Sequence, residues 1–164
     1  MTPLFRAVGM LALTALCACS EVRQPLDQYL AKLRPGTVAT LPDMGWPSGT
    51  MLCPLTTYQD QLPDSEPPAD RVNAFLKQKK FLGDEGHWSL IVVKPTPVSN
   101  ADIEQLTFKR AEFDIINEPE MLKRDAETVP VGFELKTCMP VEKARVLVTR
   151  IQRSNRTLII FGTE

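Results

Sequence analysis

Residues 64–93 read DSEPPADRVNAFLKQKKFLGDEGHWSLIVV and place an amphipathic helix directly before an apolar strand. Asp64 to Pro68 offer capping side chains, an acidic residue for the positive end of the helix dipole, and prolines in the first turn. Lys77 to Lys80 suit the C-terminal end, and Gly83 is predicted as the C-cap. The apolar residues between them recur at helical spacing: Val72, Phe75, Leu76 and Leu82. This apolar stripe has to be buried, and a sheet is expected to receive it.

Strand patterns surround this helix in the sequence. Residues 50–53 and 88–93 predict short apolar strands, and residues 131–138 alternate as a half-buried strand. Residues 107–115 alternate with a fault that a one-residue bulge near Lys109 and Arg110 would correct. Single helical turns are predicted from Ser99 to Gln105 and at Met121-Leu122. The predicted class is therefore α+β: a mainly antiparallel sheet of five or six strands with one amphipathic helix packed on one face.

The C-terminal residues predict a β-hairpin. Residues 144–152 and 157–161 are apolar on both parities, and Ser154-Asn155 would form a two-residue loop. Both faces of these strands need cover, which the helix supplies on one side. Arg153 and Arg156 flank the loop as candidate partner contacts, with the terminal strand open to strand addition. The alternative is a central, well-packed hairpin whose arginines are solvated.

The N-terminal residues predict export. Arg6 precedes an apolar run from Ala7 to Leu16, which is too short to span a bilayer and has the layout of a signal peptide. The following residues, Leu16-Cys17-Ala18-Cys19, resemble the lipobox of bacterial lipoproteins. That resemblance implies cleavage before Cys19 and a lipid on its thiol. An ordinary cleaved signal with incidental cysteines is the alternative.

The same resemblance divides the chain into three parts. Residues 1–18 would be the cleaved signal, residues 19–36 a tether containing a short helical stretch, and residues 37–164 a single periplasmic α+β domain. Several acyl chains would hold the protein stably in the membrane. Because Ser20 rather than Asp follows the lipidated residue, the resemblance implies an outer-membrane address facing the periplasm.

Composition limits the partners. The 164-residue chain has a formal charge of −1, which becomes −2 when Arg6 leaves with the signal. A nearly neutral chain has no global field to attract nucleic acid, so none is expected as a partner. Cys53 and Cys138 remain after Cys17 is removed and Cys19 is lipidated, and an oxidising compartment predicts that they form a disulfide. Reactive or metal-binding thiols are the alternative, although neither cysteine has a CxxC or histidine neighbour.

No catalytic constellation stands out in the sequence. His87, the one histidine, follows Asp84 and Glu85 and suggests either a weak metal or acid–base site or a solvated turn. Ser48 lies outside a nucleophile-elbow motif, and no phosphate-binding glycine pattern is present. Trp46 and Trp88 suggest either a ligand groove or core packing. We therefore predict no enzyme activity, no cofactor and no metal site.

These expectations favour a membrane-anchored envelope lipoprotein that binds or braces another envelope component, either a protein or peptidoglycan. The lipid anchor and the lack of a catalytic motif motivate that hypothesis. The first alternative is a periplasmic inhibitor or immunity lipoprotein. The second is an envelope hydrolase that uses His87 or a pair of carboxylates.

Overall fold

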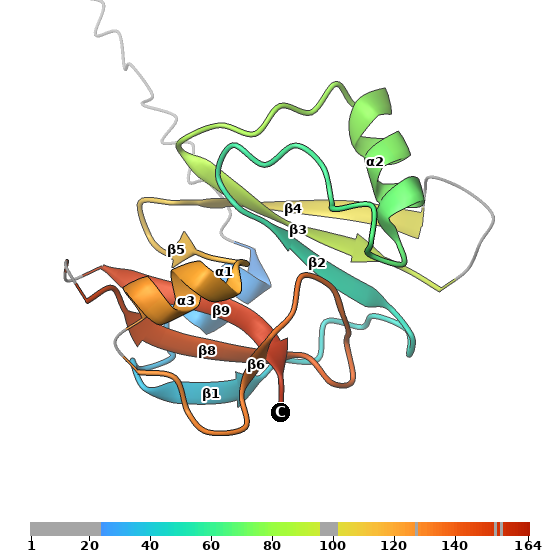
Figure 1. The fold of residues 1–164 in the computed structure, drawn as a ribbon. Helices are drawn as coiled ribbons and strands as arrows, with labels where there is room; N and C mark the ends of the chain where they lie inside the picture. Colours follow the sequence, from blue (N-terminus) through green and yellow to red (C-terminus); the bar gives the residue numbers. More distant parts are fainter. Residues whose placement is uncertain (1–23, 96–101, 127, 153, 155) are drawn as a thin grey trace, which may run out of the picture.

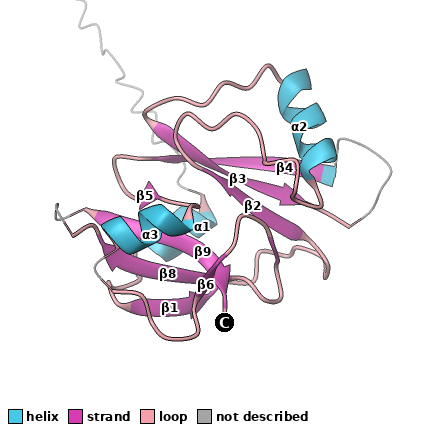
Figure 2. Cartoon of the chain, viewed as in Figure 1, coloured by secondary structure: helices cyan, strands magenta, loops and turns pink. Residues whose placement is uncertain are grey.

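The computed structural model describes residues 24–95, 102–126, 128–152, 154 and 156–164. It contains two sheets stacked on each other, with helices at their faces and edges (Figures 1 and 2). The α+β class and the mainly antiparallel pairing are thereby confirmed, with the strands divided between two sheets. None of the helices in the described part of the chain is long and apolar enough to cross a membrane.

We call the first sheet the hairpin sheet, because the C-terminal hairpin lies at its centre. Its order is β1-β8-β9-β5, and β6 pairs with the end of β9. β5 runs parallel to β9, and the other pairs are antiparallel. The strands are β1 (Thr37–Thr40), β5 (Asp114–Ile115), β6 (Glu134–Leu135), β8 (Arg145–Arg150) and β9 (Thr157–Thr163).

We call the second sheet the disulfide sheet, because it carries Cys53. Its order is β4-β3-β2-β7, and all its pairs are antiparallel. The strands are β2 (Met51–Leu55), β3 (His87–Val93), β4 (Ile103–Lys109) and β7 (Met139–Pro140). The single helical turn predicted up to Gln105 is wrong in its last residues, since Ile103 to Gln105 belong to β4.

The main core lies between the two sheets. Trp88 of β3 is 1% exposed, stacks on Phe108 at a centroid distance of 4.1 Å and meets Phe161 of β9 edge-on. Trp88 is therefore a core residue. Helix α1 (Pro25–Leu30) adds Leu26 and Leu30 to this core, and both are fully buried. The short helical stretch predicted within residues 19–36 is present as α1, and the burial of its leucines makes this helix part of the domain.

Helix α2 (Ala69–Gln78) covers the outer face of the disulfide sheet, as predicted. Val72, Phe75 and Leu76 pack with residues of β2 and β3. The predicted C-cap at Gly83 is wrong, because Lys80 takes the left-handed position with a φ of 51°. The amide of Phe81 then donates to the carbonyl of Leu76 at 3.0 Å, and that of Lys80 to Lys77 at 3.1 Å, which closes the helix in a Schellman motif.

The chain crosses between the sheets at two places where continuous strands were predicted. A turn at residues 110–112 separates β4 from β5, so the alternation fault in residues 107–115 marks a change of sheet rather than a bulge. The strand predicted over residues 131–138 is wrong except at β6, since Val131 is fully exposed and the chain leaves the hairpin sheet after Leu135 to form β7 in the disulfide sheet. At the first crossing Phe108 and Phe113 face the same core from two different sheets. At the second, Phe133 packs on the outer face of the hairpin sheet and Met139 in the core between the sheets.

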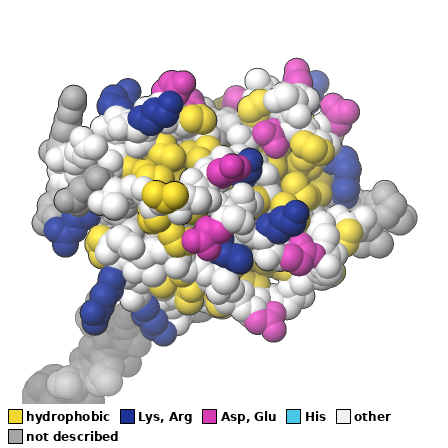
Figure 3. Space-filling view, turned by 60° about the horizontal axis from the view of Figure 1, so that its bottom comes forward, with side chains coloured by type: hydrophobic (Ala, Val, Ile, Leu, Met, Phe, Trp, Pro, Cys, Tyr) yellow, Lys and Arg dark blue, Asp and Glu magenta, His cyan; other side chains and the backbone are white. Residues whose placement is uncertain are grey.

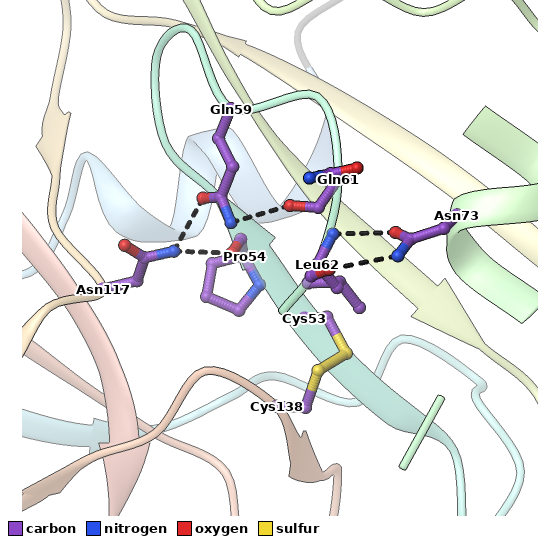
Figure 4. Close-up of a disulfide and its surroundings, with 8 residues drawn as sticks. All are labelled: Cys53, Pro54, Gln59, Gln61, Leu62, Asn73, Asn117 and Cys138. Atoms are coloured by element: carbon purple, nitrogen blue, oxygen red, sulfur yellow. Dashed lines mark hydrogen bonds between the residues drawn. A yellow bond between two sulfur atoms is a disulfide. The ribbon is translucent and has the colours of Figure 1, made fainter. Parts of the chain in front are cut away.

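Cys53 and Cys138 form the predicted disulfide, with their Cα atoms 4.3 Å apart (Figure 4). β2 pairs with β7 through Met51–Pro140 and Leu52–Met139, so Cys138 lies opposite Cys53 at the next position. Cys53 is fully buried. The bond therefore fastens the second crossing segment to the middle of the disulfide sheet.

The outer face of the hairpin sheet is covered by the chain itself. Helix α3 (Pro119–Asp125), which includes the turn predicted at Met121-Leu122, packs Met121 and Leu122 against Leu147, Leu158 and Ile160. The C-terminal hairpin is confirmed, with β8 and β9 paired from Arg145–Gly162 to Arg150–Thr157. The two-residue loop is wrong, since the amide of Ile151 donates to the carbonyl of Arg156 at 3.1 Å and this pair closes the hairpin.

Candidate functional site

A pocket of about 560 Å³ opens beside β4, and we call it the Trp46 pocket. It lies on the side of β4 that faces the core, and its volume falls in the range of small-ligand sites. Its walls come from four separate segments: Gln24, Pro25, Met44, Gly45, Trp46, Pro47, Lys94, Glu104 and Leu106. Trp46 therefore lines a groove, as one of its two interpretations predicted. Trp88 is buried in the core instead.

The loop that carries Trp46 is held by short polar contacts. The amide of Gly45 donates to the carboxylate of Asp43 at 2.8 Å, and Gly45 has a φ of 69°, a conformation that favours glycine. The hydroxyl of Ser48 and the amide of Gly49 both donate to the carboxylate of Glu142. The Ser48 hydroxyl, followed by backbone amides, holds the pKa of Glu142 below its usual value. These contacts preorganise the wall of the Trp46 pocket.

The lining combines apolar surface with a few polar groups. Met44, Trp46 and Leu106 are half-buried and pack against the main core. Lys94 and Glu104 supply one charge of each sign, so the pocket has no strong net charge. The side-chain oxygen of Gln24 is buried without a hydrogen-bond partner among the described residues. Opposite charges beside half-buried apolar side chains suit a neutral, partly apolar ligand.

The sequence singled out Trp46 but missed the rest of this lining. Lys94, Glu104 and Leu106 follow ordinary strand patterns, and Gln24 precedes a six-residue helix. Their convergence depends on the stacking of the two sheets, for which the sequence offers no local signal.

His87 is the exposed first residue of β3, directly after the bend at residues 85–86. Its Nδ1 is 3.0 Å from Oδ1 of Asp84, and the amide of Gly86 donates to the same oxygen at 2.7 Å. The hydrogen bond from His87 is the main reason that the pKa of Asp84 lies below its usual value. His87 does not line the Trp46 pocket. Among the described residues no group of three His, Cys, Asp or Glu side chains could hold a metal ion.

The two arginines predicted as partner contacts have different outcomes. Arg153 lies outside the described residues. Arg156 is engaged within the molecule: its Nε lies 2.9 Å from Oδ2 of Asp114, and its Nη2 donates to the carbonyl of Arg110 at 2.6 Å. Arg110 donates to Oδ1 of the same, largely buried Asp114 at 2.8 Å. Arg156 therefore ties the hairpin loop to the turn between β4 and β5.

The proposed open edge at the terminal strand is wrong. β9 pairs with β8 on one side and with β5 and β6 on the other. A strand that is flanked on both sides cannot accept a further strand. The end strands of the described sheets are instead β1 and β5 in the hairpin sheet and β4 and β7 in the disulfide sheet.

A second pocket of about 510 Å³ lies at the C-terminal end of α2. Its lining is Asp60, Gln61, Asn73, Ala74, Lys77, Lys80, Phe81 and Leu82. The amide group of Asn73 exchanges two hydrogen bonds with the backbone of Leu62, at 2.8 and 3.0 Å, which fixes the loop above β2 (Figure 4). Asn73 thus holds the loop, and Leu82 is 77% exposed.

The charges at the surface are mixed. In Figure 3 acidic and basic side chains are interspersed among hydrophobic ones on the face shown. The near-neutral formal charge of the chain agrees with this distribution.

Cys19, the predicted lipidation site, lies outside the described residues, which begin at Gln24. Gln24 is itself part of the Trp46 pocket, so the pocket lies at the start of the described chain. Comparisons with protein-family models, curated proteins and solved structures found no match to this chain.

Proposed function

We propose that this protein is an outer-membrane lipoprotein, anchored through Cys19, whose periplasmic domain binds another envelope component without catalysing a reaction. The position of the Trp46 pocket carries this proposal. Gln24, a lining residue of that pocket, lies five positions after Cys19 in the sequence. An extended chain of that length spans at most about 18 Å. The pocket would therefore be held near the membrane surface, facing components of the envelope.

The chemistry of the pocket supports a binding role. Trp46 and Met44 offer apolar contact area, while Lys94, Glu104 and Gln24 offer a few polar groups that can orient a ligand. Partly exposed tryptophans of this kind are frequent binding hot spots. The contacts of Glu142 hold the loop in place before any ligand arrives, which lowers the entropic cost of binding.

Cys19→Ala is expected to abolish incorporation of labelled palmitate and to leave an unprocessed precursor, because the lipid would be attached to the Cys19 thiol. Cys17→Ala is the matched control, since it removes a cysteine from the same motif and should leave labelling and processing unchanged. Labelling that persists in Cys19→Ala would contradict the proposed anchor. Sucrose-gradient fractions that place the protein with inner-membrane markers would contradict the outer-membrane address.

Trp46→Ala is expected to reduce recovery of the partner from crosslinked, detergent-solubilised envelopes about thirtyfold, the effect of losing a hot-spot tryptophan worth about 2 kcal/mol. Leu82→Ala is the matched control, because Leu82 is an exposed apolar residue of the second pocket. Mass spectrometry identifies the recovered component, and thermal melts check that both variants fold. Equal recovery with both variants would exclude the Trp46 pocket as the binding site, and recovery of a foreign toxin or lysozyme-like enzyme would favour the inhibitor alternative.

A further inference from the structure

Within the described part of the chain, the outer edge of β4 has no strand paired to it. β4 is the last strand of that sheet and pairs with β3 along its whole length, from His87–Lys109 to Val93–Ile103. Just beyond the two ends, the amide of Arg110 donates to Gly86 and the amide of Lys94 donates to the carbonyl of Asp102, both at 2.8 Å. These two bonds set the phase of the antiparallel ladder.

In an antiparallel ladder, hydrogen-bonded pairs alternate with non-hydrogen-bonded pairs. Because residues 102 and 110 are hydrogen-bonded to β3, the even-numbered residues of β4 between them form the hydrogen-bonded pairs with β3. The backbone N–H and C=O groups of Ile103, Gln105 and Thr107 point the other way, to the side where no described strand lies. Such a row of backbone groups is a template for another strand.

The Trp46 pocket adjoins this edge. Glu104 and Leu106, on the core-facing side of β4, are two of its lining residues. A strand added beside β4 would point every second side chain to the same face as Glu104 and Leu106. One of those side chains would then lie over the Trp46 pocket.

We propose that β4 accepts an extended peptide segment of the partner by strand addition, with an apolar or aromatic side chain of that segment in the Trp46 pocket. The inference rests on the proposed function and narrows its partner to a polypeptide. Backbone hydrogen bonds to Ile103, Gln105 and Thr107 supply affinity, and the pocket supplies selectivity for one side chain.

Charged side chains near the β4 edge limit which peptide segments can bind there. Glu104 and Lys109 are exposed on β4, and charged side chains on an edge strand discourage indiscriminate pairing. Lys94 and Glu104 bring opposite charges to the pocket, so a charged side chain would meet one like charge there. The fitting segment is therefore an extended one with a neutral apolar residue flanked by polar residues.

The test compares Thr107→Pro with Thr107→Ala. Thr107 is exposed and its N–H points to the open edge, so proline removes an outward donor without breaking a bond to β3. Alanine removes the same side chain and keeps the N–H. The probe is a phage-displayed library of random nine-residue peptides, selected on the mature, oxidised full-length protein in detergent.

We expect the wild type and Thr107→Ala to enrich the same peptides with a shared apolar position, and Thr107→Pro and Trp46→Ala to lose at least tenfold of that enrichment. The same peptides enriched on Thr107→Pro would overturn strand addition. A wild type that enriches no peptide above a blank surface would overturn it as well.

Amide hydrogen exchange of the wild-type protein, with and without the most strongly enriched peptide, tests strand addition even if Thr107→Pro unfolds. Strand addition should slow exchange at Ile103, Gln105 and Thr107 and leave Glu104 and Leu106 unchanged, because the latter are already bonded to β3. Slowed exchange confined to the loop of Trp46 would overturn strand addition while supporting the proposed binding function. If Thr107→Pro loses peptide binding but still recovers the partner from envelopes, strand addition is overturned and the proposed binding function is not.

Discussion

Replacing Cys53 and Cys138 together with alanine is expected to lower the free energy of unfolding by roughly 4–5 kcal/mol in the chain-entropy description. The two cysteines are 85 residues apart in the sequence, so their bond excludes a large part of the unfolded ensemble. β7 has two residues, and the disulfide lies directly next to the two residue pairs that join β7 to β2. Loss of the bond should therefore also free the segment that links the two sheets.

Urea denaturation at equilibrium measures this effect. The wild type in dithiothreitol should approach the stability of the double variant, whose own stability should not respond to the reductant. A decrease below about 1 kcal/mol would contradict a large constraint on the unfolded chain. A thiol assay that finds both cysteines reactive in the folded, exported wild type would contradict the bond itself.

Gly162→Ala is expected to cost about 3 kcal/mol, the upper part of the usual range for overpacking a core. Gly162 lies in β9 opposite Leu135 of β6. A Cβ atom there would collide with the carbonyl oxygen of Glu134 and lie 2.7 Å from Cζ of Phe133. Because part of the obstacle is backbone, relief requires β6 to move away from β9.

Gly86→Ala is the matched control for that change. A Cβ at Gly86 would meet Oδ1 of Asp84 at 3.3 Å, which is the end of a flexible side chain in an exposed turn. Its effect on the free energy of unfolding should stay within about 0.5 kcal/mol, as for most surface changes. Equal urea midpoints for the two alanine variants would show that β6 does not press on β9 as closely as the structure indicates.

Local patterns predicted the elements whose stabilising contacts are close in sequence or repeat regularly. The apolar spacing of Val72, Phe75 and Leu76 predicted α2, and the paired runs on either side of residues 152–155 predicted the β8–β9 hairpin. The compartment implied by the signal segment predicted the bond between Cys53 and Cys138, which the structure contains. The helix ends and the hairpin loop were less predictable, since Lys80 adopts a conformation that glycine usually takes.

The sequence by itself determined the α+β class, the amphipathic helix, the hairpin and the cysteine pair. Tertiary structure alone decided that the strands form two sheets, that β9 is flanked on both sides and that β4 is left at an edge. It also brought Gln24, Trp46, Lys94 and Leu106 together around one pocket. The physical reason is that an apolar alternation records only that a residue is buried. Which sheet buries it, and which edge stays open, depends on contacts between residues far apart in the chain.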